Sequence, residues 1–155
     1  MISAPAITLH VQRPYRGRTP TKATLLRWIT EVLRRFRTCS EITLRIVDLA
    51  ESAHLNETWR QRPGPTNVLS FPAEGLAAVA PQLLGDIVIC APLVRQEAVA
   101  QCKLIEAHWA HLVVHGTLHL LGYDHLTASD ARTMENLEKR VLKILGFPDP
   151  YRIQA

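Results

Sequence analysis

The residues most suited to chemistry lie close together in segment 115–125, which reads HGTLHLLGYDH. His115 and His119 are four positions apart, so on a helix their imidazoles project from one face about one turn apart. Gly122 can take the left-handed conformation that ends a helix, which lets the chain bring His125 back to the same point. Three neutral imidazoles leave the fourth position of a tetrahedral Zn²⁺ open for water, as in catalytic zinc sites. We therefore predict one Zn²⁺ per chain, bound by these three histidines.

The spacing HxxxHxxGxxH is similar to that of the metzincin metallopeptidases, with one difference. Gly116 stands where those enzymes place the Glu that acts as general base. A peptidase without this carboxylate lacks the group that takes the proton from the zinc-bound water. Because the three ligands are neutral, the site carries a charge of about +2, which favours an anion such as a phosphodiester over a neutral peptide.

The elements that must position these residues follow from the periodicity of the apolar side chains. Strands are predicted over residues 7–11, 41–47, 68–71 and 86–90, and the last is apolar from residue 87 onward and therefore central. Helices are predicted over residues 21–36, from an Asp48 cap to 59, from Pro92 to a break near 102–104, over 105–121, and from Thr127 to 145. Residues 60–66 form a loop, and residues 72–84 are irregular or partly helical. This order predicts an α+β fold, in which a small mixed sheet of about four strands packs against several helices, one of them the metzincin-like three-His metal helix.

The composition is that of a globular protein. The chain has 155 residues, of which 47% are hydrophobic and 21% charged, so we expect one domain spanning 1–155. The first 45 residues contain nine Lys or Arg against two acidic residues, whereas the formal charge of the whole chain is only +4. A basic first third favours a polyanionic partner.

Other features of the sequence bear on the compartment. The longest stretch without a charged side chain is residues 107–123, which is too short and too polar to cross a bilayer. Residues 1–5 lack the features of a secretory signal. Cys39, Cys90 and Cys102 form no CxxC motif, so we expect buried free thiols and a reducing, cytoplasmic location without membrane association.

Segment 115–125 also matches, without a mismatch, the pattern HGxLHLxGYDH of the YbeY endoribonucleases, which this chain resembles. Further blocks occur in the family's order: NETWR at 56–60 followed by PTNVLSFP at 65–72, LGDI at 84–87, and a closing GFPDPY at 146–151. Many members have Asp where this chain has Asn67, which we take as tolerated. The first third resembles the family only in layout.

The resemblance implies a metal-dependent, single-strand-specific endoribonuclease, that is, a hydrolase of phosphodiester bonds. Such enzymes act in 3′-end maturation of small-subunit (16S) rRNA, in ribosome biogenesis and in ribosome quality control. The family's zinc ligands correspond to His115, His119 and His125, and its functionally important arginine corresponds to Arg60. The resemblance also implies the small ribosomal subunit and assembly factors as partners.

The remaining site residues are expected around this centre. Arg60 begins a loop rich in Pro and Gly, where its guanidinium can form two hydrogen bonds to a phosphate. Further contacts to single-stranded RNA are expected from the arginines of the first third, namely Arg13, Arg16, Arg18, Arg34, Arg35 and Arg37. His111 and Asp124 are expected to support the ligands instead of binding the ion.

Several alternatives remain open from the sequence. The nucleophile is either a zinc-bound hydroxide or the RNA 2′-OH, and no residue is identified as the general base. A second hypothesis is a zinc metallopeptidase or amidase that takes its base from elsewhere in the chain. A third is a noncatalytic ribosome-assembly factor in which the metal is structural.

Overall fold

The fold is built on a four-stranded mixed sheet with helices on both faces. The computed structural model describes residues 5–36, 39–73 and 79–152. The strands are β1 (Ala6–Gln12), β2 (Cys39–Val47), β3 (Val68–Pro72) and β4 (Leu83–Cys90), in the spatial order β1-β2-β4-β3. The first three strands in this order are parallel, and β3 runs antiparallel to β4 at one edge. The predicted α+β class and mixed sheet are therefore confirmed.

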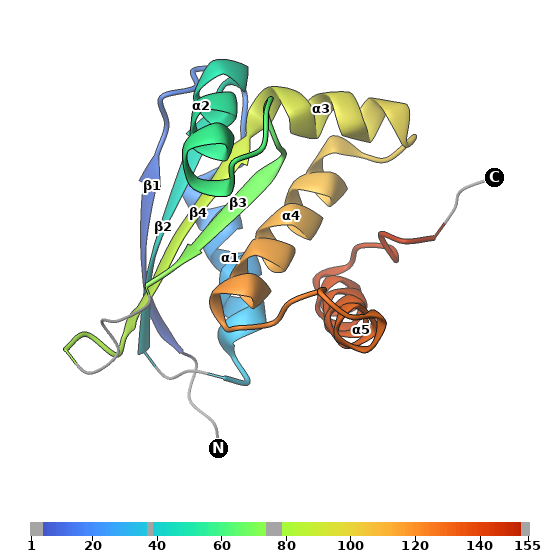
Figure 1. Ribbon diagram of the computed structural model, residues 1–155. Coiled ribbons are helices and arrows are strands. Elements are labelled where there is room, and N and C mark those ends of the chain that lie inside the picture. Colours follow the sequence, from blue (N-terminus) through green and yellow to red (C-terminus); the bar gives the residue numbers. More distant parts are fainter. Residues whose placement is uncertain (1–4, 37–38, 74–78, 153–155) are drawn as a thin grey trace.

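Five helices are described around this sheet (Figure 1): α1 (Lys22–Leu33), α2 (Leu49–Arg60), α3 (Ala91–Ala100), α4 (Ile105–Leu120) and α5 (Ala128–Leu145). The main core joins α1 and α4 to one face of the sheet, to which β4 contributes Ile87 and Ile89. The alternate residues of β4, Val88 and Cys90, pack with Leu55 of α2 on the other face. This alternation is what a strand buried on both sides requires.

Helix α4 is the central helix, and its surroundings leave one stripe of side chains partly open. Its residues are buried on nearly every side, as expected for a helix that is apolar all round. After the first turn of α4, the half-buried residues are His111, His115 and His119, which recur every four residues and so lie on one face. Helix α5 lies beside α4 (Figure 1), and its Glu138 contacts His111 and His115 on this face.

The predicted element boundaries agree with the structure to within a few residues. The expected caps are present, since Asp48 accepts a hydrogen bond from Glu51 N and Thr127 accepts one from Asp130 N. Two predicted boundaries are wrong. Helix α1 ends at Leu33 and not at Phe36, and β4 begins at Leu83, three residues before the predicted start, because its pairing with β2 continues across a bulge.

The prediction of buried thiols is also wrong for two of the three cysteines. Cys90 is buried in the smaller core, and burial raises the pKa of its thiol. Cys39 and Cys102 are exposed, because Cys39 begins the strand β2 and Cys102 lies in the turn between α3 and α4. All three are free thiols, as predicted.

Asn67, where the family often has Asp, has a specific partner in this chain. Its side-chain amide donates to both carboxylate oxygens of Glu97, at 3.0 and 3.3 Å. Glu97 in turn contacts Nε2 of the buried His108 at 2.9 Å. Because Glu97 needs donors, an amide at position 67 fits this chain better than a carboxylate.

Asn67→Asp should therefore lower the free energy of unfolding at neutral pH by about 1–3 kcal/mol, because it replaces a donor with a like charge. Urea denaturation followed by circular dichroism measures this change. The double variant Asn67→Asp with Glu97→Gln should regain most of the loss, since the amide introduced at position 97 can donate to the new carboxylate. A single Asn67→Asp variant as stable as the parent chain would contradict this account.

Candidate metal centre

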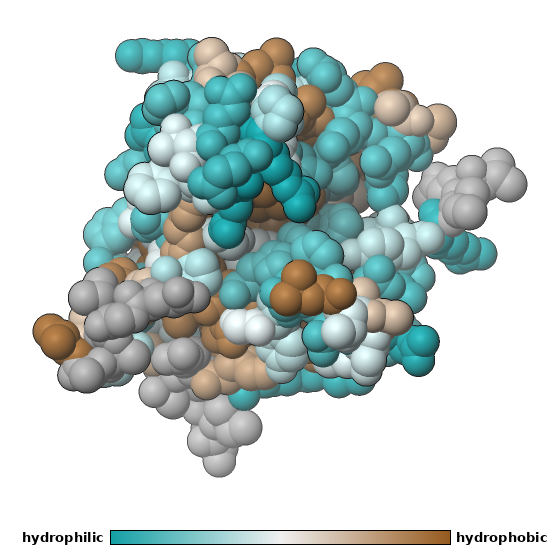
Figure 2. Space-filling view, viewed as in Figure 1, coloured by the Kyte–Doolittle hydropathy of each residue, from teal (hydrophilic) through white to brown (hydrophobic). Residues whose placement is uncertain are grey.

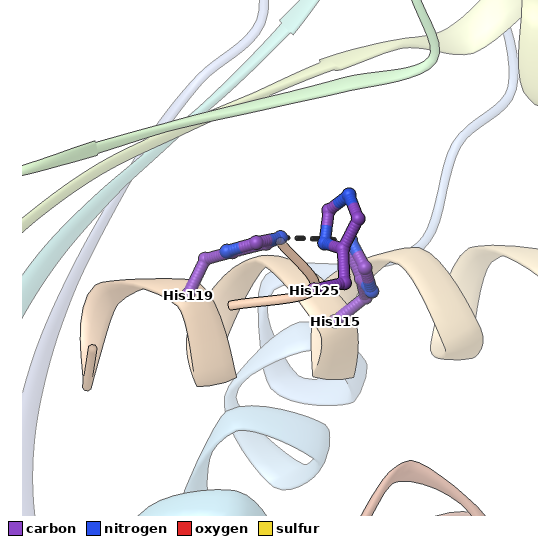
Figure 3. Close-up of side chains that lie close together, drawn as sticks. All are labelled: His115, His119 and His125. Carbon is purple, nitrogen blue, oxygen red and sulfur yellow. Dashed lines mark hydrogen bonds between the residues drawn. The ribbon is translucent and has the colours of Figure 1, made fainter. Parts of the chain in front are cut away.

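Three histidines converge beside the last turns of α4 (Figure 3). His115 and His119 project from the helix, and His125 reaches them from the loop that follows. The Nε2 atoms of His115 and His119 are 3.1 Å apart, and one nitrogen of each of the three rings lies within 4.8 Å of the others. Two nitrogens on one tetrahedral Zn²⁺ lie about 3.3 Å apart. The pair on α4 therefore already has the spacing of metal ligands.

The turn after α4 is what brings His125 back. The amide of Gly122 donates to His119 O at 3.0 Å, and Gly122 has a φ of 101°, a conformation that favours glycine. Asp124 then accepts a hydrogen bond from the backbone amide of His125 at 2.7 Å. Its carboxylate is 3.8 Å from Nδ1 of that ring, so Asp124 fixes the backbone of the loop and does not hold the imidazole.

The protonation of His119 suits a cation. Burial lowers the pKa of His119 to about 4, and the nearby rings of His115 and His125 contribute to this shift. The imidazole is therefore neutral at physiological pH and has a lone pair to give to a metal. The side chain of His125 is 59% exposed, which leaves this side of the site open to solvent.

A buried carboxylate behind the site orients His115. Glu138 of α5 is fully buried, and its Oε1 lies 3.2 Å from Nδ1 of His115 and 2.7 Å from Nε2 of His111. The hydroxyl of Tyr151 donates to the same carboxylate at 2.9 Å. Burial alone would raise the pKa of Glu138, but the hydrogen bonds from His111 and His115 outweigh it and lower the pKa to about 2. Glu138 is thus ionised and accepts all three hydrogen bonds.

This arrangement decides which nitrogen of His115 can bind a metal. Because Glu138 only accepts, Nδ1 of His115 carries the proton, and its Nε2 lone pair points to His119. A carboxylate that holds the second nitrogen of a ligating histidine is a common support of metal sites. His111 also contacts this carboxylate, so it is connected to His115 through Glu138.

Sequence reasoning missed Glu138 and Tyr151, although one signal was available. Helix α5 is amphipathic, and its buried positions are Met134, Glu138, Val141 and Leu142. An acidic residue in the middle of an apolar stripe is rarely buried unless it is paired. Glu138 therefore could have been recognised as a residue that needs a partner, although the partner itself could not.

Arg60 is connected to the same helix through the edge strand. Its Nη2 donates to Ser70 O at 2.6 Å, and the hydroxyl of Ser70 donates to Gly116 O at 3.1 Å. The guanidinium carbon of Arg60 also lies 5.4 Å from the centre of the Phe71 ring. Arg60 is the last residue of α2 and is exposed, so it is fixed in position while it remains open to a ligand.

Gly116 lies where α4 packs against the sheet. A Cβ atom placed there would lie 3.1 Å from Ile87 Cγ2, 3.3 Å from Ser70 Oγ and 3.4 Å from Val68 Cγ2. The first two distances are tighter than most contacts, so a side chain at this position would require Ile87 and Ser70 to shift by a few tenths of an ångström. This chain therefore lacks the base that metzincins place at this position, and a glycine suits the packing found here.

The other predicted RNA-binding arginines lie in different environments. Arg34 and Arg35 are exposed just after α1, beside Phe36, whose ring packs edge-on against Tyr123 at 6.0 Å. This contact brings the end of α1 next to the turn that leads to His125. Arg13 instead donates to Thr19 and to Pro20 O within its own loop. Arg37 lies outside the described residues.

The surface around these groups is hollowed. Figure 2 shows a recess on this face of the molecule, between the region of α2 with its following loop and the region of α4. Strongly hydrophilic groups overhang the recess, and hydrophobic ones lie deeper within it. A polar ligand thus meets polar groups at the rim before it reaches the interior.

Comparison with known proteins decides the family. The family model for endoribonuclease YbeY matches residues 15–146, which is most of the chain. The chain belongs to the YbeY endoribonuclease family. As a member, it is an endoribonuclease of rRNA maturation, with RNA as its substrate.

The fold has a counterpart among solved structures. The solution structure of a protein from Thermotoga maritima is similar, with a TM-score of 0.58 and 21% sequence identity. The match covers 94% of this chain and 99% of that one. Among the described helices, none is long and apolar enough to cross a membrane.

Replacing Glu138 by Gln should weaken the binding of Zn²⁺ tenfold to a hundredfold, as loss of such supporting carboxylates commonly does. The charge that stabilises the Nδ1 proton of His115 is removed while the shape is kept. Competition with a zinc-binding dye measures the affinity. Glu106→Gln, at an exposed carboxylate on α4, is the matched control. Unchanged zinc affinity in a folded Glu138→Gln protein would contradict the role given to Glu138.

Proposed function

We propose that this YbeY endoribonuclease is a zinc-dependent hydrolase that cuts single-stranded RNA during 3′-end maturation of small-subunit (16S) rRNA and in ribosome quality control. One Zn²⁺ per chain is bound by His115, His119 and His125. The convergence of these three imidazoles, with Glu138 behind His115, is the observation that supports the proposal most directly. In this role the protein works in the cytoplasm with the small ribosomal subunit and its assembly factors.

The residues of the site have separate proposed roles. When bound, Zn²⁺ supplies a Lewis acid that polarises a phosphoryl oxygen and lowers the pKa of a coordinated water toward about 7. His119 presents a neutral nitrogen, and the exposed ring of His125 lies on the open side of the site. Glu138 holds the proton of His115 at Nδ1 and keeps its Nε2 free. Because Glu138 is buried and already accepts three hydrogen bonds, it is not the general base.

Arg60 is proposed to bind the phosphate that is cut. Its exposed guanidinium is held by Ser70 O and lies over Phe71, while Ser70 also contacts the helix next to His115. A planar guanidinium can form two hydrogen bonds to a phosphodiester and stabilise the charge that develops as it reacts. Arg34 and Arg35, by the turn that leads to His125, are proposed to bind the RNA backbone farther along. Arg37 is proposed to bind the RNA backbone as well.

The peptidase hypothesis is less well supported by the same residues. Gly116 takes the place of the general base and lies against the sheet. The edge strand β3, to which an extended peptide would have to pair, already gives the carbonyl of Ser70 to Arg60. Arginine beside the site suits a phosphodiester better than a peptide bond.

The structural-metal hypothesis is also less well supported. Metal ions that only stabilise a fold are usually enclosed by four protein ligands. The three-histidine site has three described ligands, and the His125 side chain is largely in solvent. A site that is open on one side is suited to a reaction.

His119→Ala should abolish both zinc binding and RNA cleavage, because it removes one of three ligands. Metal analysis of the purified protein, together with cleavage of a single-stranded rRNA fragment, measures the two effects. His54→Ala, at an exposed histidine on α2, is the control and should keep both. Full cleavage by a metal-free His119→Ala protein would rule out the proposal. Cleavage of casein-like peptides but not of RNA, lost in the same variant, would favour the peptidase.

The arginines should differ in the kinetic step that they affect. Arg60→Ala should lower kcat about 100-fold, as loss of a group that stabilises transition-state charge commonly does. Arg34→Ala with Arg35→Ala should mainly raise KM and reduce the slope of log affinity against log salt by about 0.7 for each lost phosphate contact. Steady-state kinetics at several salt concentrations separates the two effects. Equal losses of kcat in both variants would contradict this division.

A further inference from the structure

Trp59 is an exposed indole next to Arg60, and nothing in the fold accounts for its exposure. It is 62% exposed, whereas Trp28 and Trp109 are buried in the core. Large aromatic side chains contribute most to stability when they are buried. A tryptophan left in water at this position is therefore better explained by binding than by folding.

The ring belongs to a small cluster with a cation. Its centre lies 6.4 Å from that of Phe71, and the two planes meet at 73°. Arg60 lies over the same Phe71 ring, with its guanidinium carbon 5.4 Å from the ring centre. Trp59, Phe71 and Arg60 together form what we call the aromatic platform. Unpaired nucleobases stack on aromatic rings and guanidinium planes, while their phosphates contact arginine.

The loop between Arg60 and Phe71 of the platform is fixed to α2 by buried side chains. The buried side chain of Asn56 donates to Gly64 O at 2.9 Å. The buried hydroxyl of Ser52 donates to Thr66 O at 2.7 Å and accepts from Thr66 N at 3.0 Å. Because Gly64 and Thr66 are fixed to α2, this loop has little conformational entropy left to lose when a ligand binds.

The aromatic platform is also connected to the candidate metal centre through Ser70. Arg60 donates to Ser70 O on the edge strand, and the hydroxyl of Ser70 contacts Gly116 O, next to His115. A strand of RNA whose phosphate lies on Arg60 therefore passes directly beside Trp59, the preceding residue of α2.

We propose that the aromatic platform binds one unpaired nucleobase of the RNA, in the nucleotide next to the phosphate held by Arg60. This inference rests on the proposed function and adds a physical reason for single-strand specificity. A base within a duplex is stacked and paired, so its face is not free to contact Trp59. Only an unpaired nucleotide can contact both Trp59 and Arg60.

Fluorescence of the indoles tests the proposal, because Trp59 is the exposed one of the three tryptophans. A short single-stranded RNA should quench the emission of the full-length zinc-loaded protein. An oligonucleotide of equal length and charge with abasic positions should bind about tenfold more weakly and quench little, since a stacked base contributes most of this contact. Trp59→Ala should bind the normal RNA about tenfold more weakly, measured by fluorescence anisotropy of a labelled strand, whereas Trp59→Phe should keep most of the affinity.

The controls separate this inference from the function on which it rests. Val99→Ala removes another exposed apolar side chain, on α3, and should bind like the parent protein. Equal affinity for the normal and abasic strands, or parental affinity in Trp59→Ala, would overturn the platform even if cleavage persists. Parental RNA affinity in Trp59→Ala is also the result expected if this face binds a protein instead of RNA. Loss of cleavage in the parent protein with normal quenching would contradict the nuclease proposal and leave the platform supported.

Discussion

The buried carboxylate of Glu138 is the constraint on which the geometry of the site depends. It accepts hydrogen bonds from His111 and His115 of α4 and from Tyr151 beyond α5. An ionised carboxylate in a buried position is costly unless such partners surround it, so α5 and the segment after it must dock before the charge is satisfied. The orientation of His115 is therefore a product of tertiary packing, and it is set before any ligand arrives.

The opposite side of α4 is fixed by close packing. At Gly116 the helix comes so near to β3 and β4 that an added side chain would press on Ile87 and Ser70. This proximity lets Ser70 contact the helix backbone and lets Arg60 reach the edge of β3. The histidines are thus held between a charged support on one side and, on the other, a strand whose Ser70 carbonyl accepts a hydrogen bond from Arg60. Neither His115 nor Arg60 needs a flexible loop to reach the site.

The part of the site that follows from local geometry could be predicted from the sequence. The spacing of His115 and His119 and the helix end at Gly122 depend only on helical repeat and backbone conformation, and both occur as predicted. Glu138 is 23 residues from His115, so only the docking of α5 joins them. Arg13 shows what composition cannot reveal, because nothing in the charge pattern indicated that Thr19 and Pro20 O would accept hydrogen bonds from its guanidinium.

Because contacts made by tertiary packing cannot be read from local spacing, three histidines alone do not decide the chemistry. Metzincin peptidases share the spacing of these histidines, and this chain differs from them in the residues around the histidines. A Glu at position 116 would press on Ile87 and on Ser70, the residue that contacts the helix backbone. The close approach at Gly116 is therefore also what lets Ser70 connect Arg60 to the metal centre. The glycine at position 116 thus favours phosphate over peptide in two ways, because it supplies no carboxylate and because it lets the helix contact Ser70, whose carbonyl accepts a hydrogen bond from Arg60.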